Sequence, residues 1–193
     1  GDVYKRQVIR DDEKALVLAG IMGGLNSGVT EKTTKVFLEA ANWHAAQVRR
    51  TSTRLGLRTD SSQRYEKTLD STLCYRTLLR LAEVIMQLCP EAKIVGTPTY
   101  AGPDLSEITP LVVNTSYAKI VKVLGHEISI DQVMNIFSAL GFVVEKSGDS
   151  MEVTVPSWRA TKDVECEADL IEEIGRIVGY DNITPFSPEL AVA

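Results

Sequence analysis

Three short apolar runs in the first half of the chain have the length of strands. They are ALVLAGIMGG at 15–24, KVFLEAA at 35–41 and AKIVGTPTY at 92–100. Runs of this length that end at glycine or other turn-forming residues are typical of strands that are buried in a sheet. We therefore predict a strand in each run, and we expect the first two strands to be buried.

Helical periodicity separates these runs. Residues 44–57 carry apolar positions seven apart and arginines four apart, which predicts a short helix with a basic face that ends near Gly56. A longer apolar face follows Asp70 and continues until Pro90. Asp is a preferred cap at a helix N-terminus and Pro cannot continue a helix, so the second helix is predicted between these two residues.

A glycine, a proline and small polar residues at 102–106 form the best candidate linker in the sequence. We place the domain boundary there, which predicts one domain over 8–103 and a second over 108–184. The first seven residues, GDVYKRQ, do not continue the strand pattern, and we interpret them as a possible cloning or sequencing scar. The chain has no initial methionine, and we expect it to be a piece of a longer protein.

The second half shows clear local signals for an α+β module. Ser129 and Gln132 have the spacing of a capping box at a helix start, and a turn at 147–150 lies between two alternating strands. The predicted elements are a strand over 110–113, helices over 115–124 and 129–140, a hairpin of 142–146 and 151–155, and a helix over 167–178. Two helices followed by a hairpin predict a small winged-helix-like fold.

Composition restricts the class of protein without naming a function. Hydrophobic residues make up 44% of the chain and charged residues 24%, as in ordinary globular proteins. The three cysteines have no CxxC spacing, which gives no support to a disulfide framework or a zinc site. No apolar run approaches the ~20 residues of a membrane helix. We expect a cytoplasmic protein that does not act at a membrane.

An acidic cluster precedes and enters the last predicted helix. Asp169, Glu172 and Glu173 have i, i+3 and i+4 spacing, so their carboxylates can project from one side of the helix. Oxygen ligands of this kind suit magnesium. The alternative is a solvated acidic face, in which Glu172 pairs with Arg176 four residues later. Spacing alone favours the solvated face.

Two other segments are candidates for binding. The glycine-rich GIMGGLNSG at 20–28 lacks the spacing of a P-loop or a dinucleotide site, so a structural turn is the better interpretation. Basic residues outnumber acidic ones between Gln47 and Lys67, and a phosphate-contacting surface and an ordinary ion-paired helix face explain this equally well.

Taken in order, three long segments resemble the family of phenylalanine–tRNA ligase beta subunits of bacterial type. They are AGIMGGLNSGVTEKTTKVFLEAANW, RRTSTRLGLRTDSSQRYEKTLD and VPSWRATKDVECEADLIEEIGRIVGYDNI. The resemblance implies a fold in which the C-terminal part of a mixed α/β editing domain precedes a magnesium-site domain. It also implies post-transfer hydrolysis of tyrosine that has been wrongly attached to the phenylalanine tRNA.

Site residues follow from the resemblance by motif. The editing pocket would be lined by Gly23, Glu39, Thr59 and Ser61. Glu39 would hydrogen-bond the phenolic hydroxyl of tyrosine, a group that phenylalanine lacks. Ser61 departs from the alanine that is usual in this motif. The positive charge of Arg50, Arg54 and Arg58 further suggests a contact with the tRNA acceptor end.

The resemblance also implies partners and cofactors. Its magnesium site maps onto Asp163, Asp169, Glu172 and Glu173 and would be shared with a catalytic alpha subunit in an α2β2 heterotetramer. ATP-dependent attachment of phenylalanine to its tRNA would take place on that subunit, so this chain alone should be inactive in aminoacylation. We weighed two alternatives, a freestanding aminoacyl-tRNA deacylase and a non-enzymatic nucleic-acid-binding module.

Overall fold

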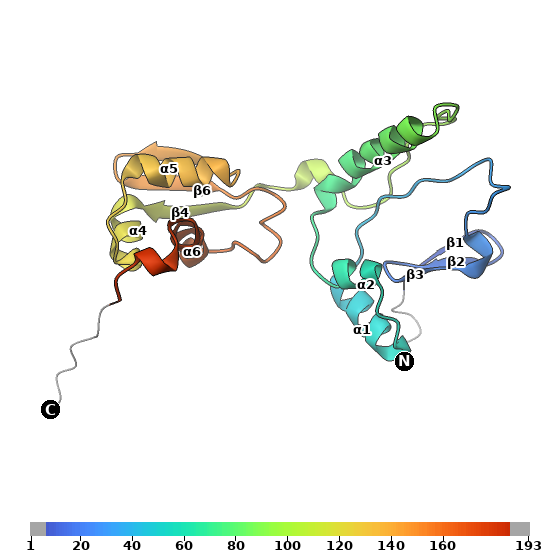
Figure 1. Cartoon of the computed structure of the whole chain (residues 1–193), viewed down its shortest axis with the longest axis horizontal. Coiled ribbons are helices and arrows are strands. Elements are labelled where there is room, and N and C mark those ends of the chain that lie inside the picture. The colour runs from blue at the N-terminus through green and yellow to red at the C-terminus, as the bar shows by residue number, and fades with distance from the viewer. Residues whose placement is uncertain (1–6, 186–193) are drawn as a thin grey trace. The chain divides into compact units, whose positions relative to one another are not determined.

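A computed structural model describes residues 7–185 (Figure 1). The chain forms two compact units, the first of which runs to Glu107 and the second of which begins at Ile108. Helices and strands occur in both units, so the mixed α and β content that the sequence predicts is confirmed. Within residues 7–185, no helix combines the length and the apolar character that crossing a membrane requires.

The first apolar run folds differently from the single buried strand that its pattern predicts. It forms β2 (Ala15–Leu18) and β3 (Met22–Gly23). β2 pairs with both β3 and β1 (Val8–Arg10) in an antiparallel sheet of order β1-β2-β3. The turn between β2 and β3 supplies the buried residues, Ala19 and Ile21, each 3% exposed. The strands themselves are half-buried or exposed, because the sheet has only three short strands.

The strands predicted over 35–41 and 92–100 are wrong. Both segments are extended but belong to no strand, and Phe37 and Val95 are 89% and 86% exposed. An apolar run predicts burial, whereas a strand also needs a neighbouring backbone to complete its hydrogen bonds. No strand among the described residues pairs with either segment.

Helices of the first unit follow the sequence prediction closely. Helix α1 (Ala45–Leu55) ends at Gly56, whose φ of +65° is the left-handed conformation that favours glycine. A 3-10 turn begins after Asp70 and leads into α3 (Cys74–Leu88). The sequence analysis did not predict α2 (Asp60–Tyr65), a helix of only six residues.

The second unit contains a three-stranded antiparallel sheet of order β4-β6-β5. Its strands are β4 (Val112–Ser116), β5 (Val143–Ser147) and β6 (Ser150–Thr154). The predicted hairpin is therefore confirmed, and Gly148 at its turn has a φ of +62°. The predicted strand over 110–113 is found two residues later than its pattern suggested.

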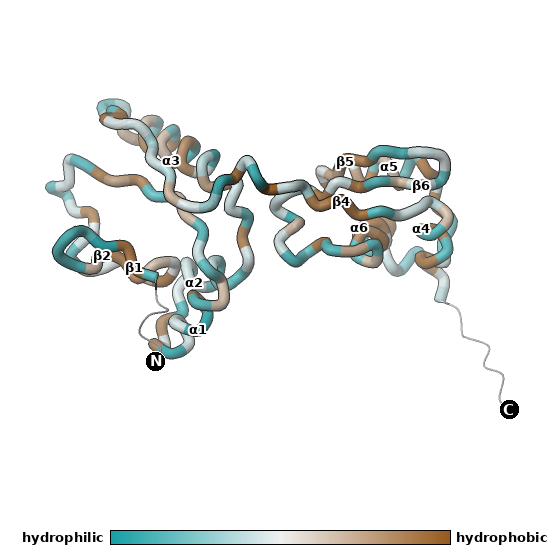
Figure 2. Tube along the Cα trace, turned by 180° about the vertical axis from the view of Figure 1, so that it is seen from behind, coloured by the Kyte–Doolittle hydropathy of each residue, from teal (hydrophilic) through white to brown (hydrophobic). Residues whose placement is uncertain are grey.

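Three helices complete this unit: α4 (Tyr117–Leu124), α5 (Ile130–Ala139) and α6 (Glu167–Val178). The capping box at the start of α5 is present as predicted. Hydrophobic positions are visible along β4 and α6 in Figure 2. The core is continuous, and its fully buried side chains include Phe137, Ile120, Met151, Leu170 and Ile174.

The turn of the β5–β6 hairpin also caps helix α4. The Asp149 carbonyl accepts a hydrogen bond from the Tyr117 N–H at 3.1 Å, and the Asp149 carboxylate accepts one from the Ala118 N–H at 3.2 Å. Ser116 accepts a further bond from the Lys119 N–H at 3.2 Å. These bonds satisfy amide groups that have no partner within the helix.

Candidate functional site

Thr59 joins α2 to the turn between β2 and β3. Its hydroxyl donates to the Ile21 carbonyl at 2.6 Å and accepts from the Ser62 N–H at 3.0 Å. The first bond spans 38 residues of sequence and fixes the start of α2 beside the end of the sheet. Thr59 therefore lies close to the start of β3, the strand that carries Gly23.

The two adjacent glycines have different roles. A Cβ at Gly23 would have no heavy atom within 4 Å, so this position faces open space. A Cβ at Gly24 would lie 2.5 Å from the Leu16 carbonyl oxygen, which real contacts do not allow. A side chain could therefore be accommodated at Gly23, whereas glycine at position 24 is required by the close approach of β2.

Glu39 lies on the extended segment that precedes α1, and its side chain remains open to solvent. Partial desolvation by the surrounding protein raises the pKa of its carboxyl above the ordinary value. Burial also raises the pKa of Tyr65, with smaller contributions from the negative charges of Glu39 and Cys74. Glu39 and the C-terminal end of α2 are thus close enough to interact electrostatically.

Two buried serines support this arrangement, and the sequence analysis missed them. Ser62 is fully buried, and its hydroxyl accepts from the Thr59 N–H at 2.9 Å. The Ser52 hydroxyl donates to the Leu57 carbonyl at 2.6 Å and lies 3.3 Å from the Ser62 hydroxyl oxygen. The spacing of Thr59 and Ser62 is that of a capping box, a signal that could have revealed α2. Ser61, the fourth predicted pocket residue, is half-buried on the same helix.

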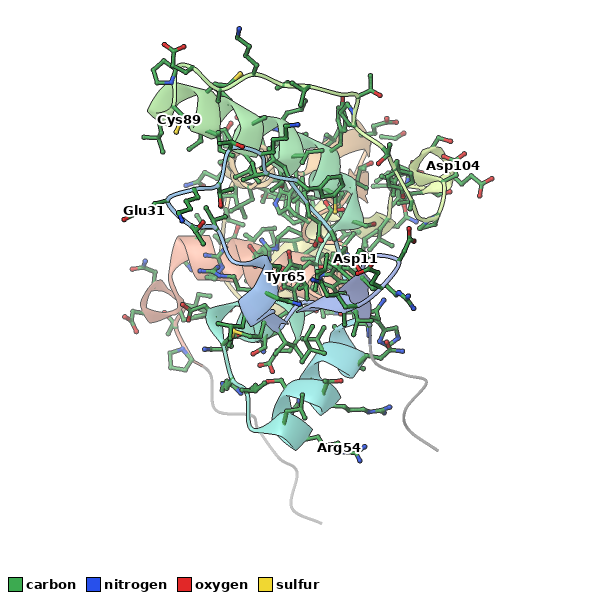
Figure 3. The ribbon with its side chains drawn as sticks, turned by 90° about the vertical axis from the view of Figure 1, so that its right-hand side faces the viewer. Asp11, Glu31, Arg54, Tyr65, Cys89 and Asp104 are labelled. Atoms are coloured by element: carbon green, nitrogen blue, oxygen red, sulfur yellow. The ribbon has the colours of Figure 1, made fainter. Side chains whose placement is uncertain are left out.

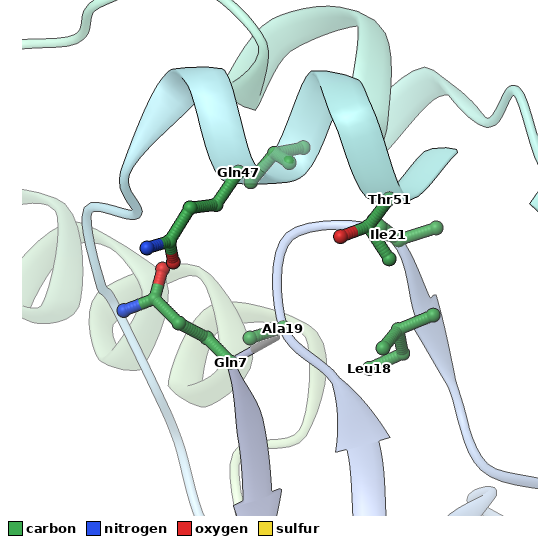
Figure 4. Close-up of a pocket in the computed structure, with 7 residues that line it drawn as sticks. Gln7, Leu18, Ala19, Ile21, Gln47 and Thr51 are labelled. Carbon is green, nitrogen blue, oxygen red and sulfur yellow. The ribbon is translucent and has the colours of Figure 1, made fainter. Parts of the chain in front are cut away.

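A small hollow lies between the sheet and α1 (Figure 4). None of the predicted pocket residues lines it, and its wall has no charged side chain. The lining residues are Gln7, Leu18, Ala19, Ile21, Gln47, Val48 and Thr51. Gln7 belongs to the fold, since its carbonyl accepts from the Ala19 N–H at 3.1 Å; the rest of the predicted scar lies outside the described residues.

The predicted basic face of α1 is exposed. Arg49 and Arg50 are both open to solvent, and Arg54 projects from the last turn of the helix (Figure 3). Arg58 follows in the loop and pairs with Glu66 at 3.3 Å. We call these four arginines the basic surface. Their positive charge lies on one helix and the loop that ends it.

The acidic cluster of the second unit is organised by arginines. Glu173 is 7% exposed, and its carboxylate receives two hydrogen bonds from Arg159, at 2.8 Å and 3.2 Å. Arg176 donates a third at 2.6 Å. These bonds from Arg159 and Arg176 lower the pKa of the Glu173 carboxyl to about 2. The predicted pairing of Glu172 with Arg176 is wrong, because Arg176 forms its ion pair with Glu173 instead.

The other three acids make separate contacts. Asp163 pairs with the Arg159 Nε, and Glu172 is exposed. Asp169 accepts from the backbone N–H groups of Glu165 and Cys166 at 2.8 Å and 2.9 Å, which lowers its pKa. Between residues 7 and 185, no group of three or more His, Cys, Asp and Glu side chains could hold a metal ion. Arginines therefore engage Asp163 and Glu173, and backbone N–H groups engage Asp169.

Both units match families of known proteins. Residues 4–90 match the family described as B3/4 domain, and residues 113–180 match the tRNA synthetase B5 domain. The chain is 39% identical over 94% of its length to the phenylalanine–tRNA ligase beta subunit of Solibacter usitatus. It is 40% identical over 95% of its length to the proteins of that name from Lactobacillus acidophilus and Bacillus licheniformis.

The class of protein is therefore an aminoacyl-tRNA synthetase component that combines a B3/4 domain with a B5 domain. The chain belongs to the family of phenylalanine–tRNA ligase beta subunits. It spans 23% of the length of the Solibacter relative and 22% of the other two.

Proposed function

We propose that this chain forms part of a phenylalanine–tRNA ligase that attaches phenylalanine to its tRNA at the expense of ATP. The observation that carries the proposal is the continuous similarity of both units to proteins named as the beta subunit of that enzyme. The name implies an alpha partner, and we propose that the alpha subunit performs the ligase reaction in an α2β2 complex. A freestanding deacylase is less favoured, because the relatives match the B5 half as well as the B3/4 half.

The test is co-expression of a full-length beta subunit containing this chain with the alpha subunit from the same source. Phenylalanine–tRNA formation should require both subunits, with neither active alone. Hydrolysis of tyrosyl-tRNA by the beta subunit, with no complex and no charging, would instead favour the freestanding deacylase.

We further propose that the B3/4 unit removes tyrosine from mischarged phenylalanine tRNA. Gly23 and Thr59 lie near each other at the β2–β3 turn, and Gly23 leaves open space there. Glu39 supplies a carboxylate that can accept a hydrogen bond from the phenolic group of tyrosine. Phenylalanine has no hydroxyl and would leave this polar group unpaired, so a correctly charged tRNA is rejected.

Ser61 should tune this selectivity. It stands on α2 two residues after Thr59, where a hydroxyl replaces the alanine methyl that is usual in the motif. Changing Ser61 to Ala should alter the ratio of tyrosyl-tRNA to phenylalanyl-tRNA hydrolysis by about tenfold or less, since one neutral hydrogen bond is involved. Deacylation of both tRNAs by the assembled ligase measures the ratio, and identical ratios would show that Ser61 is neutral.

The basic surface is proposed to contact tRNA phosphates. Changing Arg50 to Ala should weaken tRNA binding and reduce the slope of log affinity against log salt by about one. Filter binding of phenylalanine tRNA at several salt concentrations measures this slope. Arg80 on α3, which pairs with Glu83 at 2.7 Å, is the matched control. An unchanged slope for the Arg50 variant would remove α1 from the tRNA interface.

We propose that the second unit is winged-helix-like, with β5 and β6 as the wing after α4 and α5. The expected magnesium ion, shared with the alpha subunit, would require Arg159 to leave Asp163 and Glu173 when the subunits assemble. While Arg159 stays paired with Asp163 and Glu173, the acidic cluster stabilises the B5 unit.

A further inference from the structure

The hydroxyl group of Thr59 is fully engaged within the protein. Its one hydrogen is donated to the Ile21 carbonyl at 2.6 Å, and its oxygen accepts from the Ser62 N–H at 3.0 Å. A threonine hydroxyl has a single hydrogen, so Thr59 cannot donate to a substrate without releasing the Ile21 carbonyl. A direct donor role in the proposed pocket is therefore incompatible with this arrangement.

Ser62 binds the backbone of Thr59, and Ser52 packs against Ser62. The fully buried Ser62 hydroxyl accepts from the Thr59 N–H at 2.9 Å and donates to the Thr59 carbonyl at 3.0 Å. Ser52, 5% exposed, donates its one hydroxyl hydrogen to the Leu57 carbonyl at 2.6 Å, and its oxygen packs against the Ser62 hydroxyl oxygen at 3.3 Å. Buried polar groups that are all satisfied in this way hold a single geometry.

We propose that Thr59 and Ser62, packed against Ser52, form a hydroxyl tether that positions the amino-acid pocket. The tether joins α2 to the β2–β3 turn, and it thereby sets the distance between the start of α2 and the open space at Gly23. Thr59 is then a positioning residue. Its hydroxyl holds the β2–β3 turn in place, and the rate of hydrolysis depends on the position of that turn. The inference rests on the proposed editing function.

The test uses the assembled ligase and measures kcat and KM of tyrosyl-tRNA hydrolysis separately. Changing Thr59 to Val keeps the shape of the side chain but removes its hydroxyl. Displacement of a pocket wall should lower kcat on the order of tenfold or more, with KM for the tRNA changed much less. Changing Thr59 to Ser retains the hydroxyl and should restore kcat. Changing Ser62 to Ala should lower kcat in the same direction, because the Thr59 N–H loses its acceptor.

One control variant and one assembly assay make the result interpretable. Thr53, an exposed threonine on α1, provides the matched control, and its change to Val should leave hydrolysis unchanged. Phenylalanine charging by each tetramer verifies that the complex has assembled, and if the Thr59→Val tetramer does not form, Ser62→Ala carries the test.

The outcomes separate the tether from the editing function itself. If Glu39→Ala lowers hydrolysis while Thr59→Val and Ser62→Ala do not, the tether is wrong and the pocket stands. If Thr59→Ser is as slow as Thr59→Val, the hydroxyl bonds are not what matters and the tether is again wrong. If Glu39→Ala is also without effect, the proposed editing pocket is wrong, and the tether with it.

Discussion

Replacing Glu39 with Ala in the assembled ligase should lower tyrosyl-tRNA hydrolysis by about ten- to a hundredfold, the value of one hydrogen bond to a charged group. Phenylalanine charging should be unaffected, because Glu39 belongs to the proposed editing pocket. The phenolic hydroxyl of tyrosine is the group that distinguishes it from phenylalanine, and Glu39 is the proposed acceptor. The measurement is single-turnover deacylation of tyrosyl-tRNA by the tetramer.

Glu31 provides the control for this change. It is an exposed glutamate in a turn of the same loop that leads to α1 (Figure 3), and Glu31→Ala removes the same charge from that loop. Hydrolysis should then proceed at the rate of the unaltered enzyme. Equal losses in the two variants would indicate a general effect of charge, and an unchanged rate in Glu39→Ala would place Glu39 outside the pocket.

The second large effect is expected at Glu173. Changing Glu173 to Gln leaves two guanidinium groups facing a neutral amide in a site where the carboxylate is 9% exposed. Removal of one partner from a buried ion pair should lower the free energy of unfolding of the B5 unit by about 3 kcal/mol. Urea unfolding followed by Trp158 fluorescence, in a Trp43→Phe background, reports on this unit alone.

The exposed neighbour Glu172 separates two interpretations of the acidic cluster. If arginine pairing is what matters, Glu172→Gln should change the free energy of unfolding by no more than about 0.5 kcal/mol. If both changes loosened the association of alpha and beta subunits in light scattering while leaving the B5 unit stable, the shared magnesium ion would be the better explanation.

Local signals in the sequence predicted the second unit well because its helix ends and its hairpin are specified by neighbouring residues, although β4 pairs with the distant β6. The capping box at Ser129, the left-handed glycine after α4 and the two-residue hairpin turn each specify structure within a few residues. The first unit was predicted less well. Its segments 35–41 and 92–100 have the apolar character of strands, but sequence pattern cannot supply the neighbouring backbone that makes a strand.

The candidate sites, too, could be predicted from the sequence only in part. Spacing identified Asp169, Glu172 and Glu173 as neighbours on one helix, but it could not show that Arg159, 14 residues before Glu173, would return to the Glu173 carboxylate. Similarly, the resemblance supplied Thr59, yet its bond to Ile21 depends on how α2 folds back on the sheet. Pairings of this kind are decided by tertiary structure.

The capping of α4 by the hairpin turn restricts how this part of the protein can diverge. Asp149 offers its carbonyl and its carboxylate to consecutive amides of Tyr117 and Ala118. An extra residue in the turn would move both groups away from the helix and shift the register of β5 against β6, which reverses the faces of the strand. We therefore expect relatives with this capping arrangement to keep the length of the turn and to place insertions and deletions elsewhere in the domain.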